Sequence, residues 1–193
     1  MDFKTGDILL FDDNTSHISL YNISSVLIKY FTNSKYTHCG MILKDPLNYK
    51  GLYLWESTIS NIADIEDQKK KIGVTLVPLE EYIQKYDGQI YYRKLVSSKT
   101  ISPNTINQIH TLVYNKPYDI IPIDWIEAIF QRDPCPQKAN RFWCSALLGF
   151  ILVKMGFLST SVDWSILRPC DFSSNSNSLK YINSFYCKEL QIK

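Results

Sequence analysis

The fold and the chemistry of this chain depend on one stretch, residues 141–155, which reads RFWCSALLGFILVKM. After Cys144, apolar residues return at a spacing of three and four, at Leu147, Leu148, Ile151, Leu152 and Met155. This spacing is typical of a helix face that packs against a core. The sequence therefore predicts a buried helix with Cys144 at its start.

A cysteine at the start of a helix has chemical consequences. The first turn presents unpaired N–H groups and a partial positive charge, which together stabilise a thiolate over a thiol. The same N–H groups can hold a developing oxyanion. A cysteine without a partner base is more often a small buried apolar residue, so the interpretation of Cys144 depends on finding such a base.

Length and composition predict one globular domain over residues 1–193. The chain is 45% hydrophobic and 21% charged, which is typical of a folded protein. The net charge is only +2, and the one dense basic run, residues 69–71, follows Glu66 and Asp67. We interpret this run as a solvated loop and expect no nucleic-acid partner, because nucleic-acid binders carry a basic stripe.

Targeting and cysteine patterns predict a soluble, cytoplasmic protein. The first residues lack the apolar centre of a signal peptide, and no apolar run approaches the roughly 18 residues of a membrane span. The five cysteines are widely spaced, with no C-x-x-C pair and no matching histidine spacing. Neither a disulfide framework, a structural metal nor a cofactor is expected.

The best candidate for a partner base is His38, in residues 34–43, which we expect to form a strand. Alternate residues of a strand share a face. One face would then carry Tyr36, His38, Gly40 and Ile42, and the other Thr37, Cys39 and Met41. This pattern predicts that His38 and Cys39 do not serve the same pocket. A hydrogen-bonded core histidine would give the same sequence.

A carboxylate follows on the next predicted strand, residues 52–57, antiparallel to the first. Glu56 ends an apolar run, and a carboxylate beside a histidine fixes the imidazole tautomer and raises its basicity. The alternative is a strand-end Glu that reaches solvent.

Other elements follow from turn and cap signals. Residues 61–73 have the polar character of a loop or lid, and residues 16–33 suggest a helix from about Ile23. Strands at 74–79 and 89–95 flank a short helix at 80–86. Ser102 caps a helix that runs to about Tyr114, with Ile106, Ile109 and Val113 on its buried side and His110 off it.

The order of short motifs resembles that of a known family. The motifs are residues 5–11 (TGDILLF), 36–42 (YTHCGMI), 55–57 (WES), 77–79 (VPL), 117–119 (PYD), 143–145 (WCS) and 168–172 (RPCDF). Together they look like the circularly permuted papain-like enzymes of the NlpC superfamily, nearest in pattern to the YiiX-like group, which includes proteins of poxvirus type.

The resemblance implies an α+β fold, in which a small antiparallel sheet or half-barrel packs against the cysteine helix. It implies Cys144 as the nucleophile, His38 as the general base and Glu56 as the group that orients His38. Tyr36 and Trp143 are weaker candidates for the substrate pocket or the oxyanion. A viral member would act in the host cytoplasm or the virion.

The substrate stays open between amide or peptide bonds and lipid acyl bonds, hydrolysed or transferred through a thioester, and peripheral membrane contact stays open with it. Aromatic residues could line an acyl-chain groove or form the core, and the core is the commoner outcome; they are Tyr53, Trp55, Trp125, Phe130, Phe142 and Trp143. Two alternatives to an enzyme are an inactive binding module on the same fold and a structural interaction protein in which Cys144 is merely packed.

Overall fold

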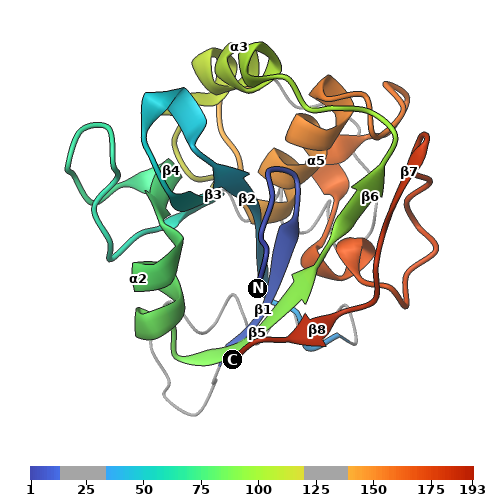
Figure 1. Ribbon diagram of the computed structural model, residues 1–193, viewed down its shortest axis with the longest axis horizontal. Helices are drawn as coiled ribbons and strands as arrows, with labels where there is room; N and C mark the ends of the chain where they lie inside the picture. The colour runs from blue at the N-terminus through green and yellow to red at the C-terminus, as the bar shows by residue number, and fades with distance from the viewer. Residues whose placement is uncertain (14–33, 120–138) are drawn as a thin grey trace.

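A six-stranded antiparallel sheet forms the centre of the protein (Figure 1), as seen in a computed structural model that describes residues 1–13, 34–119 and 139–193. Its order is β4-β3-β2-β1-β5-β8. The bounds are β1 (Ile8–Asp13), β2 (His38–Lys44), β3 (Leu52–Ile59), β4 (Ile72–Pro78), β5 (Gly88–Arg93) and β8 (Leu190–Gln191). A separate antiparallel pair joins β6 (Leu95–Ser97) to β7 (Ser184–Tyr186).

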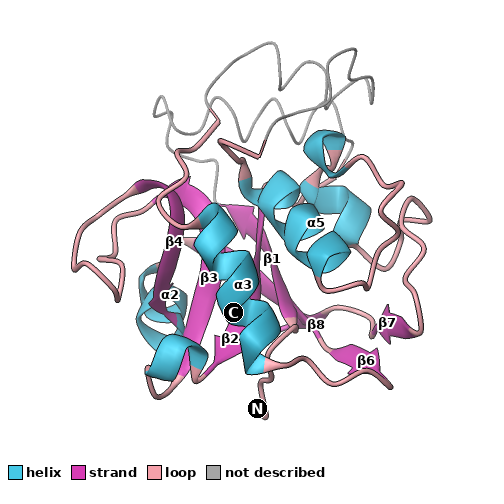
Figure 2. Cartoon of the chain, turned by 90° about the horizontal axis from the view of Figure 1, so that it is seen from above, coloured by secondary structure: helices cyan, strands magenta, loops and turns pink. Residues whose placement is uncertain are grey.

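Helices cover both faces of this sheet, so the expected α+β class is confirmed (Figure 2). The described α-helices are α2 (Leu79–Lys85), α3 (Pro103–Val113) and α5 (Cys144–Lys154). Short 3-10 turns are η1 (Pro46–Asn48), η2 (Trp164–Ile166) and η3 (Pro169–Phe172). Within the described part of the chain, no helix combines the length and the apolar character needed to cross a membrane.

The alternation of strand residues sorts the core into two clusters. Cys39 and Met41 of β2 pack with α3 and α5 on one face of the sheet. Ile42 of the same strand and Leu79 of α2 belong to the cluster on the other face. Period-two strands with both faces covered therefore place successive side chains in different cores.

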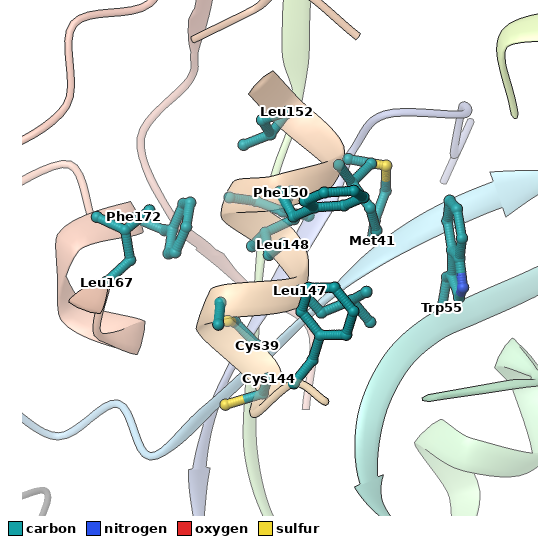
Figure 3. Packing of buried hydrophobic residues seen from close by; sticks show 14 of the residues in the cluster. Cys39, Met41, Trp55, Cys144, Leu147, Leu148, Phe150, Leu152, Leu167 and Phe172 are labelled. Carbon is teal, nitrogen blue, oxygen red and sulfur yellow. The ribbon is translucent and has the colours of Figure 1, made fainter. Parts of the chain in front are cut away.

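Helix α5 begins at Cys144, as the sequence predicts, but it is buried on more than one face. Every residue from Cys144 to Leu152 is buried. The sheet covers one side, and η2 and η3 cover another; a Cβ at Gly149 would lie 2.5 Å from Leu167 Cδ1. The sequence spacing predicts one buried face of the helix. A second face is buried as well, because the chain after α5 folds back over the helix (Figure 3).

Helix α3 follows its sequence signals closely. The Ser102 hydroxyl accepts a hydrogen bond from Asn104 N at 3.2 Å, and the three predicted apolar residues are buried. His110 departs from the expectation, because its side chain is only 12% exposed: Nε2 lies 2.7 Å from Glu66 Oε1 and the ring packs against Trp55.

Some expectations fall outside the described residues. They are the helix from Ile23, and the positions of Trp125 and Phe130.

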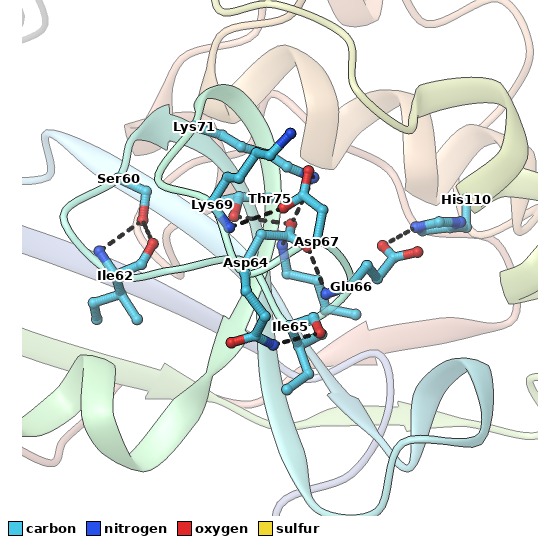
Figure 4. Close-up of polar contacts among 12 residues, drawn as sticks. Ser60, Ile62, Asp64, Ile65, Glu66, Asp67, Lys69, Lys71, Thr75 and His110 are labelled. Carbon is cyan, nitrogen blue, oxygen red and sulfur yellow. Dashed lines mark hydrogen bonds and ion pairs between the residues drawn. The ribbon is translucent and has the colours of Figure 1, made fainter.

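The segment between β3 and β4 is a loop held in place by hydrogen bonds and ion pairs to the buried carboxylate of Asp64 (Figure 4). Asp64 accepts hydrogen bonds from Leu76 N at 2.9 Å and from Thr75 Oγ1 at 3.1 Å. Lys71 pairs with Asp64 and Asp67, at 3.2 Å in each case, and is 12% exposed. The expectation of a solvated basic run is wrong for Lys71, because the acidic residues before it fold back onto its ammonium group.

We expect Asp64→Ala to lower the free energy of unfolding by about 3 kcal/mol, because it removes one of the two carboxylates that pair with the Lys71 ammonium and leaves two buried donors without their acceptor. Urea denaturation followed by circular dichroism measures this. Asp67→Ala is the matched control, since Asp67 contacts the same Lys71 but is 26% exposed; it should cost less than about 1 kcal/mol. Equal losses in the two variants would contradict a structural role for Asp64.

Candidate active site

Strands β2 and β3 bring His38 and Glu56 together on the face of the sheet that α2 covers. Gly40 makes this close approach possible: a Cβ there would lie 2.8 Å from Leu54 Cδ1 and 3.3 Å from Glu56 Cβ. His38 Nε2 is hydrogen-bonded to Glu56 Oε2, and Glu56 is fully buried. The ring of Phe11, across from His38 on β1, lies 5.2 Å from the imidazole. The predicted solvent-facing alternative for Glu56 is therefore wrong.

The start of α5 is fixed by hydrogen bonds on both sides of Cys144. Ser57, on the opposite face of β3 from Glu56, donates from Oγ to the Phe142 carbonyl at 2.7 Å. Ser145 Oγ donates to the Leu167 carbonyl at 2.6 Å. The same strand therefore presents the carboxylate to His38 and anchors the segment that carries the cysteine.

A further clamp comes from residues 117–119. Phe142 N donates to Pro117 O at 3.1 Å, and Asp119 N donates to Phe142 O at 3.2 Å. The buried carboxylate of Asp119 pairs with Arg141 Nε at 3.2 Å. These residues carry a motif of the family resemblance, and their hydrogen bonds hold the segment that leads into Cys144. That role could not be predicted from the motif.

Cys144 and Glu56 both act on the pKa of His38. Burial disfavours the charged imidazole, but the negative charges of Cys144 and Glu56 outweigh it and raise the pKa of His38 to about 10. Because Nε2 faces Glu56, Nδ1 is the nitrogen available to the sulfur. An imidazolium with this pKa stays charged at neutral pH.

The thiol of Cys144 is shifted in the complementary direction. A hydrogen bond from the Cys39 thiol, together with the charge and hydrogen bond of His38, holds the pKa of Cys144 well below its usual range despite the opposing effect of burial. The shifts favour an ionised sulfur at Cys144 and a charged imidazole at His38, whose Nε2 is hydrogen-bonded to Glu56.

His38 and Cys39 pack on opposite faces of the sheet, as strand alternation predicts. The His38 ring contacts Phe11 of one core cluster, and Cys39 belongs to the other cluster. His38 is the first residue of β2, so both residues lie where the strand begins. Both also influence the pKa of Cys144.

The two weaker candidates differ in position: Tyr36 lines a polar cavity, and Trp143 is buried in the core. Tyr36 was expected on the face of His38, but it packs with the cluster of Cys39, its ring 5.5 Å from that of Tyr91. The reason is that β2 begins only at His38, so the alternation does not extend back to Tyr36. Trp143 is 6% exposed, and its Nε1 donates to the Leu167 carbonyl at 3.2 Å.

Tyr82 of α2 is a residue that the sequence did not suggest. Its hydroxyl lies beside the Glu56 carboxylate, and burial together with that charge raises the pKa of Tyr82 well above its usual value. Its ring packs against Phe11, at 5.4 Å between centroids. The contact joins a helix to a strand 26 residues before it, so local periodicity carries no signal for it.

A polar cavity of about 700 Å³ lies between the segment that leads into β2, η3 and the loop after η3. Tyr36 and Cys170 line it, whereas Cys144, His38 and Glu56 do not. Two carboxylates in its wall are neutralised within the protein: Asp171 Oδ1 by Arg168 at 2.8 Å, and Glu189 by hydrogen bonds from Ser174. Its lining is therefore polar without a large uncompensated charge.

Among the described residues, no three His, Cys, Asp or Glu side chains are grouped so that they could hold a metal ion. Comparison with known proteins gave no match: no family model fits the chain, and no curated protein matches its sequence.

Proposed function

We propose that this protein is a cysteine-dependent hydrolase or acyltransferase that acts through a thioester, on a permuted papain-like fold of the NlpC type. Cys144 is the nucleophile, His38 the general acid and base, and Glu56 the group that orients His38. The observation that carries the proposal is the hydrogen bond of His38 to the buried Glu56, together with the raised pKa of His38 and the lowered pKa of Cys144 at the start of a buried helix. This is the arrangement that activated nucleophiles share across unrelated folds.

The reaction would begin with attack of the Cys144 thiolate on an acyl carbonyl. N–H groups in the first turn of α5 hold the resulting oxyanion, and each such donor is typically worth about 10²–10³ in rate. Trp143, the N-cap residue, makes no capping bond with its side chain, so it leaves these donors available. His38 then gives its proton to the leaving group as the C–N or C–O bond breaks.

The second half of the reaction would release the thioester. Neutral His38, held in one tautomer by the buried Glu56, takes a proton from water or from an acceptor amine as that nucleophile attacks the acyl carbon. The C–S bond breaks, and the thiolate and imidazolium are restored. Whether water or an amine attacks decides between hydrolysis and transfer.

The residues around the candidate site favour a polar substrate over one with a long acyl chain. Four of the aromatic residues considered for an apolar groove, Tyr53, Trp55, Phe142 and Trp143, are buried in the core. The cavity on the Tyr36 side is instead walled by hydroxyl, amide and paired charged groups. We therefore favour an amide or peptide bond that carries polar groups on one side.

A thiol-directed electrophile tests this function. With iodoacetamide at neutral pH, peptide mass spectrometry should find Cys144 modified at least about tenfold faster than Cys170 or Cys187, because the pKa of Cys144 is held well below its usual range. The comparison is stringent, since Cys144 is buried and the other two are half-buried. Equal and slow modification of the three would instead favour an inactive binding module or a packed structural cysteine.

A further inference from the structure

The two-stranded β6–β7 sheet lies apart from the central sheet, at one side of the molecule (Figures 1 and 2). Its register pairs Val96 with Phe185. Both side chains are exposed, Val96 to 36% and Phe185 to 57%, and Ile182, just before β7, is 44% exposed. Three large apolar side chains therefore face solvent on this small pair of strands and its approach.

The outward position of these residues is fixed by their inward-facing neighbours. Leu95, beside Val96, packs against the core cluster that contains α5, and Tyr186, beside Phe185, is buried in that cluster. The Tyr186 hydroxyl donates to the Gly6 carbonyl at 2.8 Å. Because adjacent residues of a strand point to opposite faces, Val96 and Phe185 cannot turn inward without removing Leu95 and Tyr186 from the core.

Lysines flank these apolar residues. Residues 94–100 and 173–188, which form and border the two strands, contain four lysines and no Asp or Glu. One of them, Lys99, is hydrogen-bonded to the Met155 carbonyl. The other three are exposed: Lys94, Lys180 and Lys188. The whole chain has a net charge of only +2, so this side of the molecule carries a local excess of positive charge, brought together by strand pairing.

We propose that this surface binds an anionic phospholipid bilayer. It is called here the β6–β7 patch and consists of Val96, Ile182, Phe185, Lys94, Lys180 and Lys188. The apolar side chains enter the boundary between headgroups and acyl chains, and the lysine ammonium groups lie at the level of the lipid phosphates. The patch includes no residue of the candidate active site, and the inference does not depend on the proposed function.

The composition of the patch favours a lipid surface over a macromolecule. Protein interfaces are depleted in lysine and enriched in arginine, and nucleic acids are bound largely through hydrogen bonds. The patch has lysine without arginine, and its apolar part is a phenyl ring and two branched aliphatic side chains that offer no hydrogen bond. Lysine suits a bilayer surface because its long apolar stem can lie along the acyl region while its charge reaches the phosphates.

Co-sedimentation of the whole chain with vesicles tests the proposal. The vesicles are phosphatidylcholine alone, or an equal mixture of phosphatidylcholine and phosphatidylserine. The native protein should bind the mixture at least about tenfold more tightly, because each lysine near an anionic surface contributes about fivefold. Phe185→Ser should weaken binding about tenfold, and Lys94→Gln and Lys188→Gln about fivefold each. Added salt should weaken binding as well, because it screens the charges.

Two substitutions outside the patch are matched controls. Leu112→Ser removes from α3 an apolar side chain of similar exposure, 49%. Lys70→Gln removes an exposed lysine from the dense basic run at residues 69–71. Both variants should keep the native affinity for the mixed vesicles. A thermal melt of each variant establishes that it is folded, as expected for changes to exposed side chains.

The proposal is overturned if the native protein binds the two kinds of vesicle equally, or if the patch variants and their controls lose the same affinity. Weaker binding in the lysine variants alone also overturns it, because no apolar side chain would then enter the bilayer. Binding to duplex DNA without binding to vesicles would assign the patch to a nucleic acid. A dimer in sedimentation velocity that Phe185→Ser abolishes, again without vesicle binding, would assign it to a second copy of the chain.

Discussion

Replacement of His38 by Ala is expected to lower kcat/KM by about 10²–10⁴, the usual contribution of a positioned general acid or base. The loss has two parts. The variant has no group to transfer the proton, and the Cys144 thiolate loses the imidazolium that stabilises it. The thiol pKa should therefore rise toward the ordinary cysteine value of about 8.5, and alkylation at pH 6 should slow accordingly.

The dependence of activity on pH in the native protein is a second test of the role of His38. Activity should rise as Cys144 loses its proton, at a pH well below the ordinary thiol pKa. It should fall only as His38 loses its proton near its pKa of about 10. The direction of both changes follows from the active form of Cys144 and His38, in which the sulfur is deprotonated and the imidazole is protonated.

His110→Ala is the matched control for His38. His110 also pairs with a carboxylate, with Nε2 2.7 Å from Glu66 Oε1, and it is about as buried, its side chain being 12% exposed against 14% for His38. It packs against Trp55 and Tyr114 and contributes to α3. Its loss should affect stability and leave the alkylation profile in place; equal kinetic losses in the two variants would contradict the assignment of His38.

Glu56→Gln is expected to lower kcat/KM at neutral pH by about 10²–10⁴, comparable with removal of the carboxylate from other nucleophile–histidine–acid triads. The amide preserves the volume but removes the charge that, with Cys144, keeps His38 protonated. The upper limb of the pH profile should therefore move downward from about 10, since a group that raised the pKa of His38 has been weakened. Steady-state kinetics against pH measure both effects.

The control for Glu56 is Glu66→Gln, which makes the same change beside His110. It should leave the position of the upper limb unchanged. A Glu56→Gln variant with the native upper limb would show that the carboxylate does not act through His38. A parallel urea titration separates this kinetic effect from any loss of stability, because Glu56 is fully buried.

Most of the secondary structure could be predicted from the sequence, because it depends on neighbours a few residues apart. The start of α5 at Cys144, the cap at Ser102 and the strand that carries Glu56 all follow from local spacing and capping chemistry. The three residue types of the candidate site could also be identified from the sequence. Their positions relative to one another could not, because separations of 88 and 106 residues along the chain say nothing about distances in the fold.

The wrong predictions concern features that local sequence patterns do not describe. Alternation predicts the face of the sheet on which a residue lies, but it does not predict where the strand begins. Tyr36 was placed on the wrong face because β2 begins only at His38. Lys71 was read as solvated because its partners, Asp64 and Asp67, reach it only through the fold of the loop.

The sequence by itself determined which segments become helices and strands, and supplied a cysteine at a helix start, a strand histidine and a strand carboxylate. Only the tertiary structure decided that His38 and Glu56 are hydrogen-bonded and that Tyr82 lies beside Glu56. The physical reason is that secondary structure follows from short-range dihedral and capping preferences. The site instead depends on how distant surfaces pack, which no local pattern encodes.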